Sequence, residues 1–73
     1  MLGTGDIVIY LDHHRKPFPA IVFKEYGANE IGEVLADLHV MKPYGTMTLE
    51  RVHRDEKTQG PETYHAKGAI RVR

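Results

Sequence analysis

The alternating stretch over residues 34–41 constrains the fold of this chain more than any other. Apolar side chains occupy every second position, and the polar Asp37 and His39 fall between them. Successive side chains of a strand point to opposite sides, so this period of two is typical of a strand that buries one face. The apolar phase consists of Val34, Ala36, Leu38 and Val40. The stretch therefore predicts a half-buried strand with Asp37 and His39 on its outer face.

A turn and a returning strand follow directly. Pro43-Tyr44-Gly45 combines the fixed φ of proline with a residue that tolerates positive φ, which favours a reversal of the chain. The returning segment, about 47–53, changes its apolar phase before Val52. A bulge near Glu50-Arg51 would bring Val52 back to the core, because a bulge inserts one extra residue into a strand. The sequence thus predicts a central hairpin with a bulged second strand.

Other segments supply the remaining strands. Residues 6–11 and 19–26 are rich in β-branched and aromatic side chains, and a last, short strand is expected near the end, where Ile70 and Val72 lie two apart. No window shows the spacing of an amphipathic helix over more than two turns. We therefore predict one all-β domain over residues 1–73, folded as a small SH3-like antiparallel barrel of about five strands.

The apolar phases of these strands define an expected core. It consists of Val8, Tyr10, Val22, Val34, Ala36, Leu38, Val40, Leu49 and Val52. Four further apolar residues have no obvious internal partner, namely Phe18, Ile31, Leu35 and Met41. A chain of this length buries a thin core and has no cysteine for disulfides, so contact with another subunit would supply the missing burial. Self-association is therefore expected.

Composition limits the classes of function. No apolar run is long enough to cross a membrane, and the first residues lack the basic start and apolar block of a signal peptide, so a soluble protein is expected. Ten basic and ten acidic side chains cancel, which argues against a non-specific nucleic-acid binder. The charges are unevenly distributed, because residues 51–73 hold six basic and three acidic side chains. The candidate partner-binding residues are Arg51, Arg54, Lys67, Arg71 and Arg73, with Tyr44 and Tyr64 as candidates for stacking.

Catalytic and metal chemistry lack the necessary patterns. The five histidines show no chelating spacing, and adjacent His13 and His14 are expected to point to opposite sides. The chain has no serine, and the Asp55-Glu56 pair is flanked by Arg54 and Lys57, as in a solvated charge cluster. We therefore expect no catalytic residue, no metal and no cofactor.

Several short motifs occur in a recognisable order. They are Gly5-Asp6-Ile7-Val8-Ile9-Tyr10, Ala20-Ile21-Val22, Leu38-His39-Val40, Pro43-Tyr44-Gly45 and Asp55-Glu56, followed by Gly60 and Thr63-Tyr64-His65. This order resembles a group of small bacteriophage-encoded proteins with the pattern Gly-Asp-x-Val-x-Tyr, Ala-Ile-Val, an alternating strand, Pro-x-Gly, Asp-Glu and a closing Gly-Thr-Trp-His. The resemblance covers about residues 5–65. It departs at Tyr64, which replaces the tryptophan, and at Pro61-Glu62, which separate Gly60 from Thr63.

The resemblance implies an SH3-like barrel of phage or prophage origin without catalytic residues. The expected function is a non-catalytic structural or interaction module, a virion-associated protein acting through contacts with other subunits in the host cytoplasm or the virion. The alternative is a nucleic-acid-binding small barrel, which the basic residues after position 50 would serve. Salt separates the two, because phosphate-driven binding weakens steeply with ionic strength and apolar burial does not.

Overall fold

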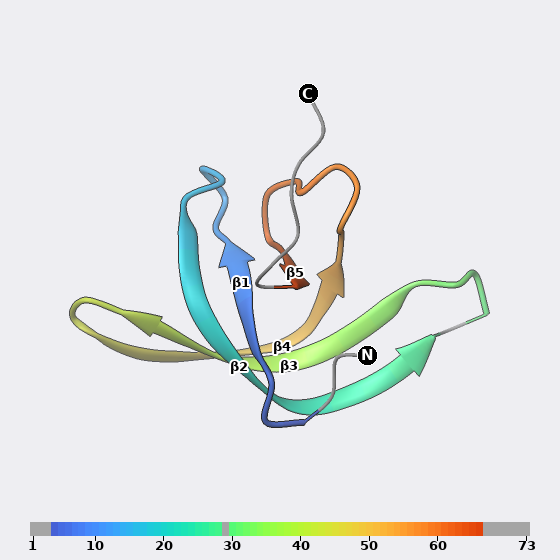
Figure 1. Ribbon diagram of the computed structural model, residues 1–73, viewed down its shortest axis with the longest axis horizontal. Helices are drawn as coiled ribbons and strands as arrows, with labels where there is room; N and C mark the ends of the chain where they lie inside the picture. Colours follow the sequence, from blue (N-terminus) through green and yellow to red (C-terminus); the bar gives the residue numbers. More distant parts are fainter. Residues whose placement is uncertain (1–3, 29, 67–73) are drawn as a thin grey trace.

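The computed structural model describes residues 4–28 and 30–66, which form five strands (Figure 1). In chain order they are β1 (Ile7–Leu11), β2 (Pro17–Ala28), β3 (Val34–Lys42), β4 (Gly45–Arg54) and β5 (Thr63–Ala66). The strand expected around Ile70 and Val72 lies outside the described residues. Within the described part of the chain there is no helix, and so none long and apolar enough to span a membrane.

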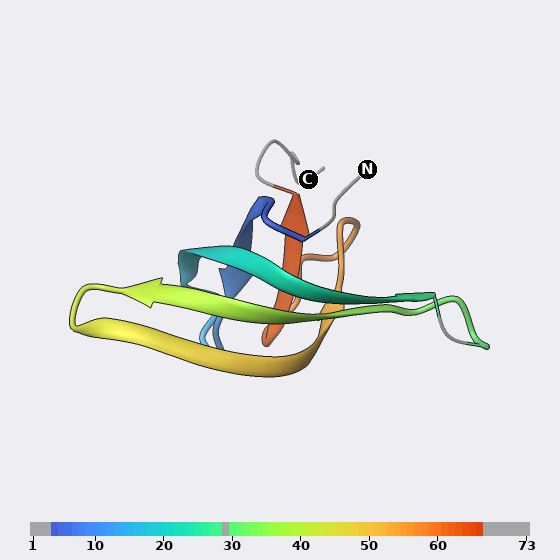
Figure 2. The ribbon, with the colours of Figure 1, turned by 90° about the horizontal axis from the view of Figure 1, so that it is seen from below.

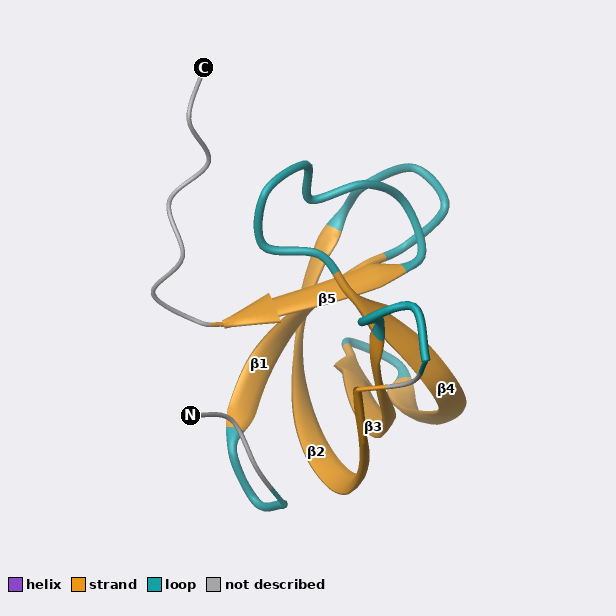
Figure 3. Ribbon diagram, turned by 90° about the vertical axis from the view of Figure 1, so that its right-hand side faces the viewer, coloured by secondary structure: helices purple, strands orange, loops and turns teal. Residues whose placement is uncertain are grey.

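The five strands close into a barrel in the order β1-β2-β3-β4-β5. Strands β2, β3 and β4 form one long sheet, with β1 and β5 on one side of it (Figure 2). Strand β5 crosses from β1 to β4 (Figure 3), pairing antiparallel with β1 and parallel with β4. The prediction of a small all-β barrel of about five strands is confirmed, with the difference that one of its five strand contacts is parallel.

Strand β2 begins two residues earlier than expected, at Pro17. Prolines lack the amide donor that a central ladder needs. The pairing of β2 with β3 begins only at Ala20, so Pro17 and Pro19 have a hydrogen-bonded neighbour on the β1 side alone. The two prolines can therefore lie in β2, because no strand on the β3 side needs an N–H donor from them.

The core closely follows the alternation of the strands. Its buried residues are Val8, Tyr10, Phe18, Ala20, Val22, Ala36, Leu38, Val40, Val52 and Tyr64, and Leu49 packs against them partly buried. Two expectations need correction. Val34 is only half-buried because it lies at the start of β3, near the tip of a hairpin, and Phe18, expected to lack an internal partner, packs in the core opposite Tyr10. Three other apolar residues were expected to lack an internal partner. Of these, Ile31 is exposed, while Leu35 and Met41 are half-buried.

The predicted bulge in β4 is present. Ala36 pairs with Val52 and Leu38 pairs with Leu49, so β4 contains one residue more than β3 between these pairs. Arg51 at the bulge has a φ of 52°. The extra residue restores Val52 to the core, as its apolar character requires.

Asp37 alternates with the core residues Ala36 and Leu38 as predicted, but it is buried rather than exposed. Register shifts in the neighbouring strands, at Tyr26 in β2 and at Arg51 in β4, accompany the contacts that cover it. Its carboxylate accepts the Arg51 backbone N–H and the Tyr26 hydroxyl, each at 2.8 Å. Only 4% of Asp37 is exposed. We call Tyr26, Asp37 and Arg51 the Asp37 cluster.

Candidate functional site

Outward side chains of four neighbouring strands form a sheet face without formal charges. In the register of the sheet, Ile7 lies opposite Ile21, Ile21 opposite His39, and His39 opposite Thr48. With Phe23 and the outward positions next to this row toward the β1–β2 and β3–β4 turns, the face comprises Ile7, Ile9, Pro19, Ile21, Phe23, His39, Met41, Thr46 and Thr48. On the other side of the row, β3 and β4 continue with the charged Asp37 and Glu50, which bound the face. We call it the uncharged face.

The uncharged face presents apolar area to solvent in the described structure. Ile7 is 48% exposed and Phe23 is 37% exposed. The Phe23 ring stacks on the His39 ring, with centroids 4.2 Å apart and planes at 20°. His39 Nδ1 in turn lies 3.1 Å from Thr48 Oγ1, so these contacts join side chains of β2, β3 and β4 across the face. None of the nine residues is Asp, Glu, Lys or Arg, although these make up 27% of the chain. Depletion of charge around exposed aromatic and aliphatic groups is typical of protein interfaces.

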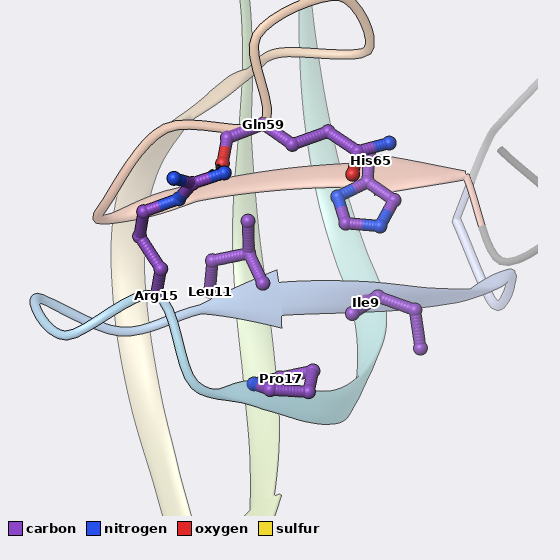
Figure 4. Close-up of a pocket in the computed structure, with 6 residues that line it drawn as sticks. All are labelled: Ile9, Leu11, Arg15, Pro17, Gln59 and His65. Atoms are coloured by element: carbon purple, nitrogen blue, oxygen red, sulfur yellow. Dashed lines mark hydrogen bonds between the residues drawn. The ribbon is translucent and has the colours of Figure 1, made fainter. Parts of the chain in front are cut away.

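A pocket of about 310 Å³ borders this face (Figure 4). Its floor is apolar, because Ile9 and Leu11 face it from β1 and Pro17 lies opposite Leu11 in β2. His65 lies opposite Ile9 in β5, and two loops contribute Arg15 and Gln59. The lining therefore combines an apolar floor with one cation, one amide and one imidazole.

Two loops hold the polar residues of the pocket. In the first, Asp12 Oδ1 accepts the backbone N–H groups of His14 and Lys16, each at 2.8 Å. In the second, Asp55 accepts the N–H groups of Thr58 and Gly60 at 2.9 and 3.1 Å. These donors lower the pKa of Asp55, because they stabilise its charged form.

A hydrogen bond joins the two loops at the pocket. Arg15 Nε donates to the Gln59 carbonyl oxygen at 3.2 Å. Both residues have positive φ, 61° for Arg15 and 50° for Gln59. Residues with side chains rarely adopt this conformation, so the surrounding contacts must fix it. The two loops therefore place the guanidinium and the amide at defined positions.

Gln59 and His65 are buried, and each has a nitrogen without a partner. Gln59 is 8% exposed and His65 is 7% exposed. Gln59 Nε2 and His65 Nδ1 are enclosed and hydrogen-bond to no group of residues 4–28 and 30–66. Burial lowers the pKa of His65, and the charges of Glu56 and Asp55 oppose this effect only in part, so the imidazole is neutral at pH 7. Figure 4 shows the Gln59 side chain extending toward His65.

The residues predicted to bind a partner are not all available for that purpose. Tyr64 is fully buried in the core, so its predicted role in stacking is wrong. Its hydroxyl finds no partner in the described structure, and burial raises its pKa. Tyr44 is 84% exposed at the β3–β4 turn and stays a candidate. Lys67, Arg71 and Arg73 lie outside the described residues.

The two described arginines of the prediction make contacts within the protein. The Arg51 guanidinium carbon lies 5.6 Å from the centre of the Tyr26 ring, and Arg54 Nε pairs with Glu56 at 2.7 Å. Tyr44 and Arg54 lie at opposite ends of β4, up to about 30 Å apart along a straight strand. The structure does not gather these residues into one surface.

Among the described residues, no group of three or more His, Cys, Asp or Glu could hold a metal ion. His13 and His14, expected to point apart, have ring centroids 4.0 Å apart. Arg15, Gln59 and His65 were not recognised as a group from the sequence. Their grouping depends on the geometry of two loops, and the nearest signal is that both phases of residues 7–11 are apolar, which suits a strand covered on both faces or closed into a barrel.

Comparison of the chain with protein-family models, with curated proteins and with solved structures finds no match. The function is therefore argued from the uncharged face and the pocket.

Proposed function

We propose that this barrel is a non-catalytic interaction module that self-associates through the uncharged face. The observation that carries the proposal is the absence of formal charge among the nine residues of the uncharged face, in a chain of ten basic and ten acidic residues. Two copies of such a face meet without removing a formal charge from water, which is the costly step in burying a polar surface. The zero net charge of the chain adds no long-range repulsion between copies.

The size of the face sets the expected strength of association. Four strands span about 15 Å at the usual spacing between strands. A stable interface buries about 800 Å² on each partner, more than a patch of this width supplies alone. We therefore expect a dissociable dimer that further contacts strengthen in an assembly. The motif order supports a phage or prophage virion as the setting, and this part of the proposal depends on the sequence resemblance alone.

Nucleic-acid binding is the second candidate function, favoured by the cations on Tyr26. Lys24 Nζ lies 4.9 Å from the ring centre and the Arg51 guanidinium carbon lies 5.6 Å from it. Aromatic rings beside cations can bind single strands by stacking and phosphate contact. Against this use, the Tyr26 hydroxyl is held by Asp37, and the ring is already in contact with the protein's own cations.

The proposal is tested by sedimentation velocity over roughly 10 µM to 1 mM, the range expected for a small interface. Wild-type protein should show concentration-dependent dimerisation that does not weaken in high salt. Phe23→Glu and Ile7→Glu place a charge in the uncharged face and should give monomers. Tyr44→Glu is the matched control, because it changes an exposed aromatic residue at a hairpin tip and should dimerise normally. Dimers that survive both face variants, or dissociate in Tyr44→Glu alone, would contradict the proposal.

A further inference from the structure

The pocket beside the uncharged face contains more hydrogen-bond donors than its surroundings satisfy. Arg15 uses Nε on the Gln59 carbonyl, and no carboxylate of the described residues lies within ion-pair distance of its guanidinium. Gln59 Nε2 carries two further N–H groups without a partner. Buried donors in folded proteins nearly always have a partner, so an enclosed free amide beside a pocket calls for an external one.

No carboxylate lines the pocket itself. Asp55 and Glu56 act electrostatically on His65, but neither belongs to the lining. The oxygens of Asp55 accept two loop N–H groups, and those of Glu56 accept the Ala66 N–H and the Arg54 Nε. Their charges are therefore partly compensated by fixed donors. The pocket lining itself presents the Arg15 guanidinium and the Gln59 amide, and these donors favour an anionic acceptor despite the carboxylates nearby.

From this arrangement we propose that the pocket is a binding site for a carboxylate carried on a short aliphatic group. The carboxylate accepts hydrogen bonds from Arg15 and from the Gln59 amide. His65 lies at the same polar end of the pocket as these two residues (Figure 4). The aliphatic group packs on Ile9, Leu11 and Pro17, which offer no hydrogen-bonding side chain. The volume of about 310 Å³ is at the lower end for ligand pockets and suits a group of a few carbon atoms.

Gln59 acts as a movable cover in this site. Its side chain extends toward His65 (Figure 4), and the free nitrogens of both residues are enclosed in the described conformation. Rotation of the Gln59 side chain toward the pocket presents its free amide to a ligand. Within the described residues, Gln59 Nε2 makes no hydrogen bond that would oppose this rotation, and the contact with Arg15 uses the backbone carbonyl. The loop itself can therefore remain in place while a ligand binds.

The same chemistry has two sources, a free short-chain acid and the C-terminal carboxylate of a partner polypeptide. Titration with isovalerate and with acetyl-Gly-Gly-Leu separates them, observed by the backbone amide NMR signals of dilute protein. The proposal expects saturable shifts centred on Ile9, Leu11, Gln59 and His65. Tighter binding of the peptide would assign the site to a polypeptide terminus, and tighter binding of isovalerate would assign it to a free acid. Isoamyl alcohol and the amidated peptide lack the carboxylate and should bind about tenfold more weakly or worse.

Variants test the named residues. Arg15→Gln should weaken binding of the carboxylate probe about tenfold, because it removes a charge-assisted hydrogen bond. Arg51→Gln is the matched control, since Arg51 is also an exposed arginine at positive φ but lies on Tyr26, away from the pocket. Gln59→Glu should reduce binding further by repelling the anion. Absence of saturation with either probe, equal binding of the alcohol, or equal effects of Arg15→Gln and Arg51→Gln would each overturn the proposal.

The proposed site does not depend on self-association through the uncharged face. Repeating the titration in Phe23→Glu, which should be monomeric, distinguishes the two, because Phe23 does not line the pocket. Unchanged binding in a monomeric variant supports the carboxylate site as a separate property. Loss of binding together with loss of the dimer would show that the shifts report the subunit interface, and would overturn the site.

Discussion

The barrel buries polar side chains in two places and treats them differently. In the Asp37 cluster each carboxylate oxygen accepts a hydrogen bond from the protein, one from a backbone N–H and one from a hydroxyl. In the pocket, Gln59 Nε2 and His65 Nδ1 are as deeply buried and have no partner in the described residues. A satisfied buried group fixes the fold, here by holding two strand bulges together. An unsatisfied one lowers stability and leaves bonding capacity for a ligand.

The apolar core sets the scale for this comparison. Leu38 is fully buried in β3, next to Asp37. Leu38→Ala should lower the free energy of unfolding by about 2–4 kcal/mol, because it removes apolar contacts and leaves a cavity. Urea denaturation measures the loss. An unchanged midpoint would contradict the register of β3.

Asp37→Ala should have the next largest effect, about 2–3 kcal/mol. The substitution leaves the Arg51 N–H and the Tyr26 hydroxyl without their acceptor, and the first of these holds the β4 bulge. Asp37→Asn keeps an acceptor and should lose less. The same denaturation experiment measures both variants, and equal losses would show that charge rather than hydrogen bonding fixes the bulges.

Acid should act on the pocket and its supporting loop in two steps, at different pH. The pKa of His65 is lowered from its ordinary value of 6.5, so the unfolded chain binds the proton more readily than the folded one. The contribution of neutral His65 to the free energy of unfolding is fully present above pH 6.5. It is lost as the pH falls from 6.5 toward the lowered pKa of the folded state. Asp55 also has a lowered pKa, so its contribution is lost only as the pH falls below 3.8.

Thermal unfolding as a function of pH separates these two steps. In wild-type protein the melting temperature should decline in both ranges. His65→Gln should remove the decline that begins near pH 6.5 and keep the later one. A variant that retains the first decline would show that another group titrates there.

Gln59→Met should have the smallest effect on stability, within about 0.5 kcal/mol or slightly stabilising. The side chain keeps its length, and the amide nitrogen that it removes makes no hydrogen bond in the described structure. Denaturation measures the change, with Asp37→Ala as the contrasting variant. A loss comparable to that of Asp37→Ala would mean that the Gln59 amide is satisfied, and the comparison between the two regions would fail.

The positions of β1 to β4 were predictable because each is marked by a run of β-branched and aromatic residues or by alternating apolar residues. The phase change before Val52 even indicated the β4 bulge. The burial of Asp37 was not predictable, since it depends on contacts with Tyr26 and Arg51 from two other strands, and the register shift at Tyr26 in β2 leaves no mark in the order of residue types. Tyr64 was named as a stacking candidate because of the basic residues near it in the sequence, and β5, with four residues, is too short for a period that would indicate its burial.

The pocket was beyond sequence analysis for a related reason. Arg15 and Gln59 meet through two loops whose positive φ values occur at residues other than glycine, so no residue type marks them. The uncharged face left a clearer signal. Both phases of residues 7–11 are apolar, which predicts a strand covered on both sides. The described structure covers the inner side with the core and leaves Ile7 of the outer side 48% exposed.

The central claim is that the uncharged face is where two copies of the chain meet. The most direct test is a filtered NMR experiment on a mixture of isotopically labelled and unlabelled protein, which detects contacts only between copies. We expect intermolecular contacts from Ile7, Ile21, Phe23 and Met41. Contacts confined to Tyr44 or Ile31 at the hairpin tips, or none in a sample that sediments as a dimer, would contradict the account.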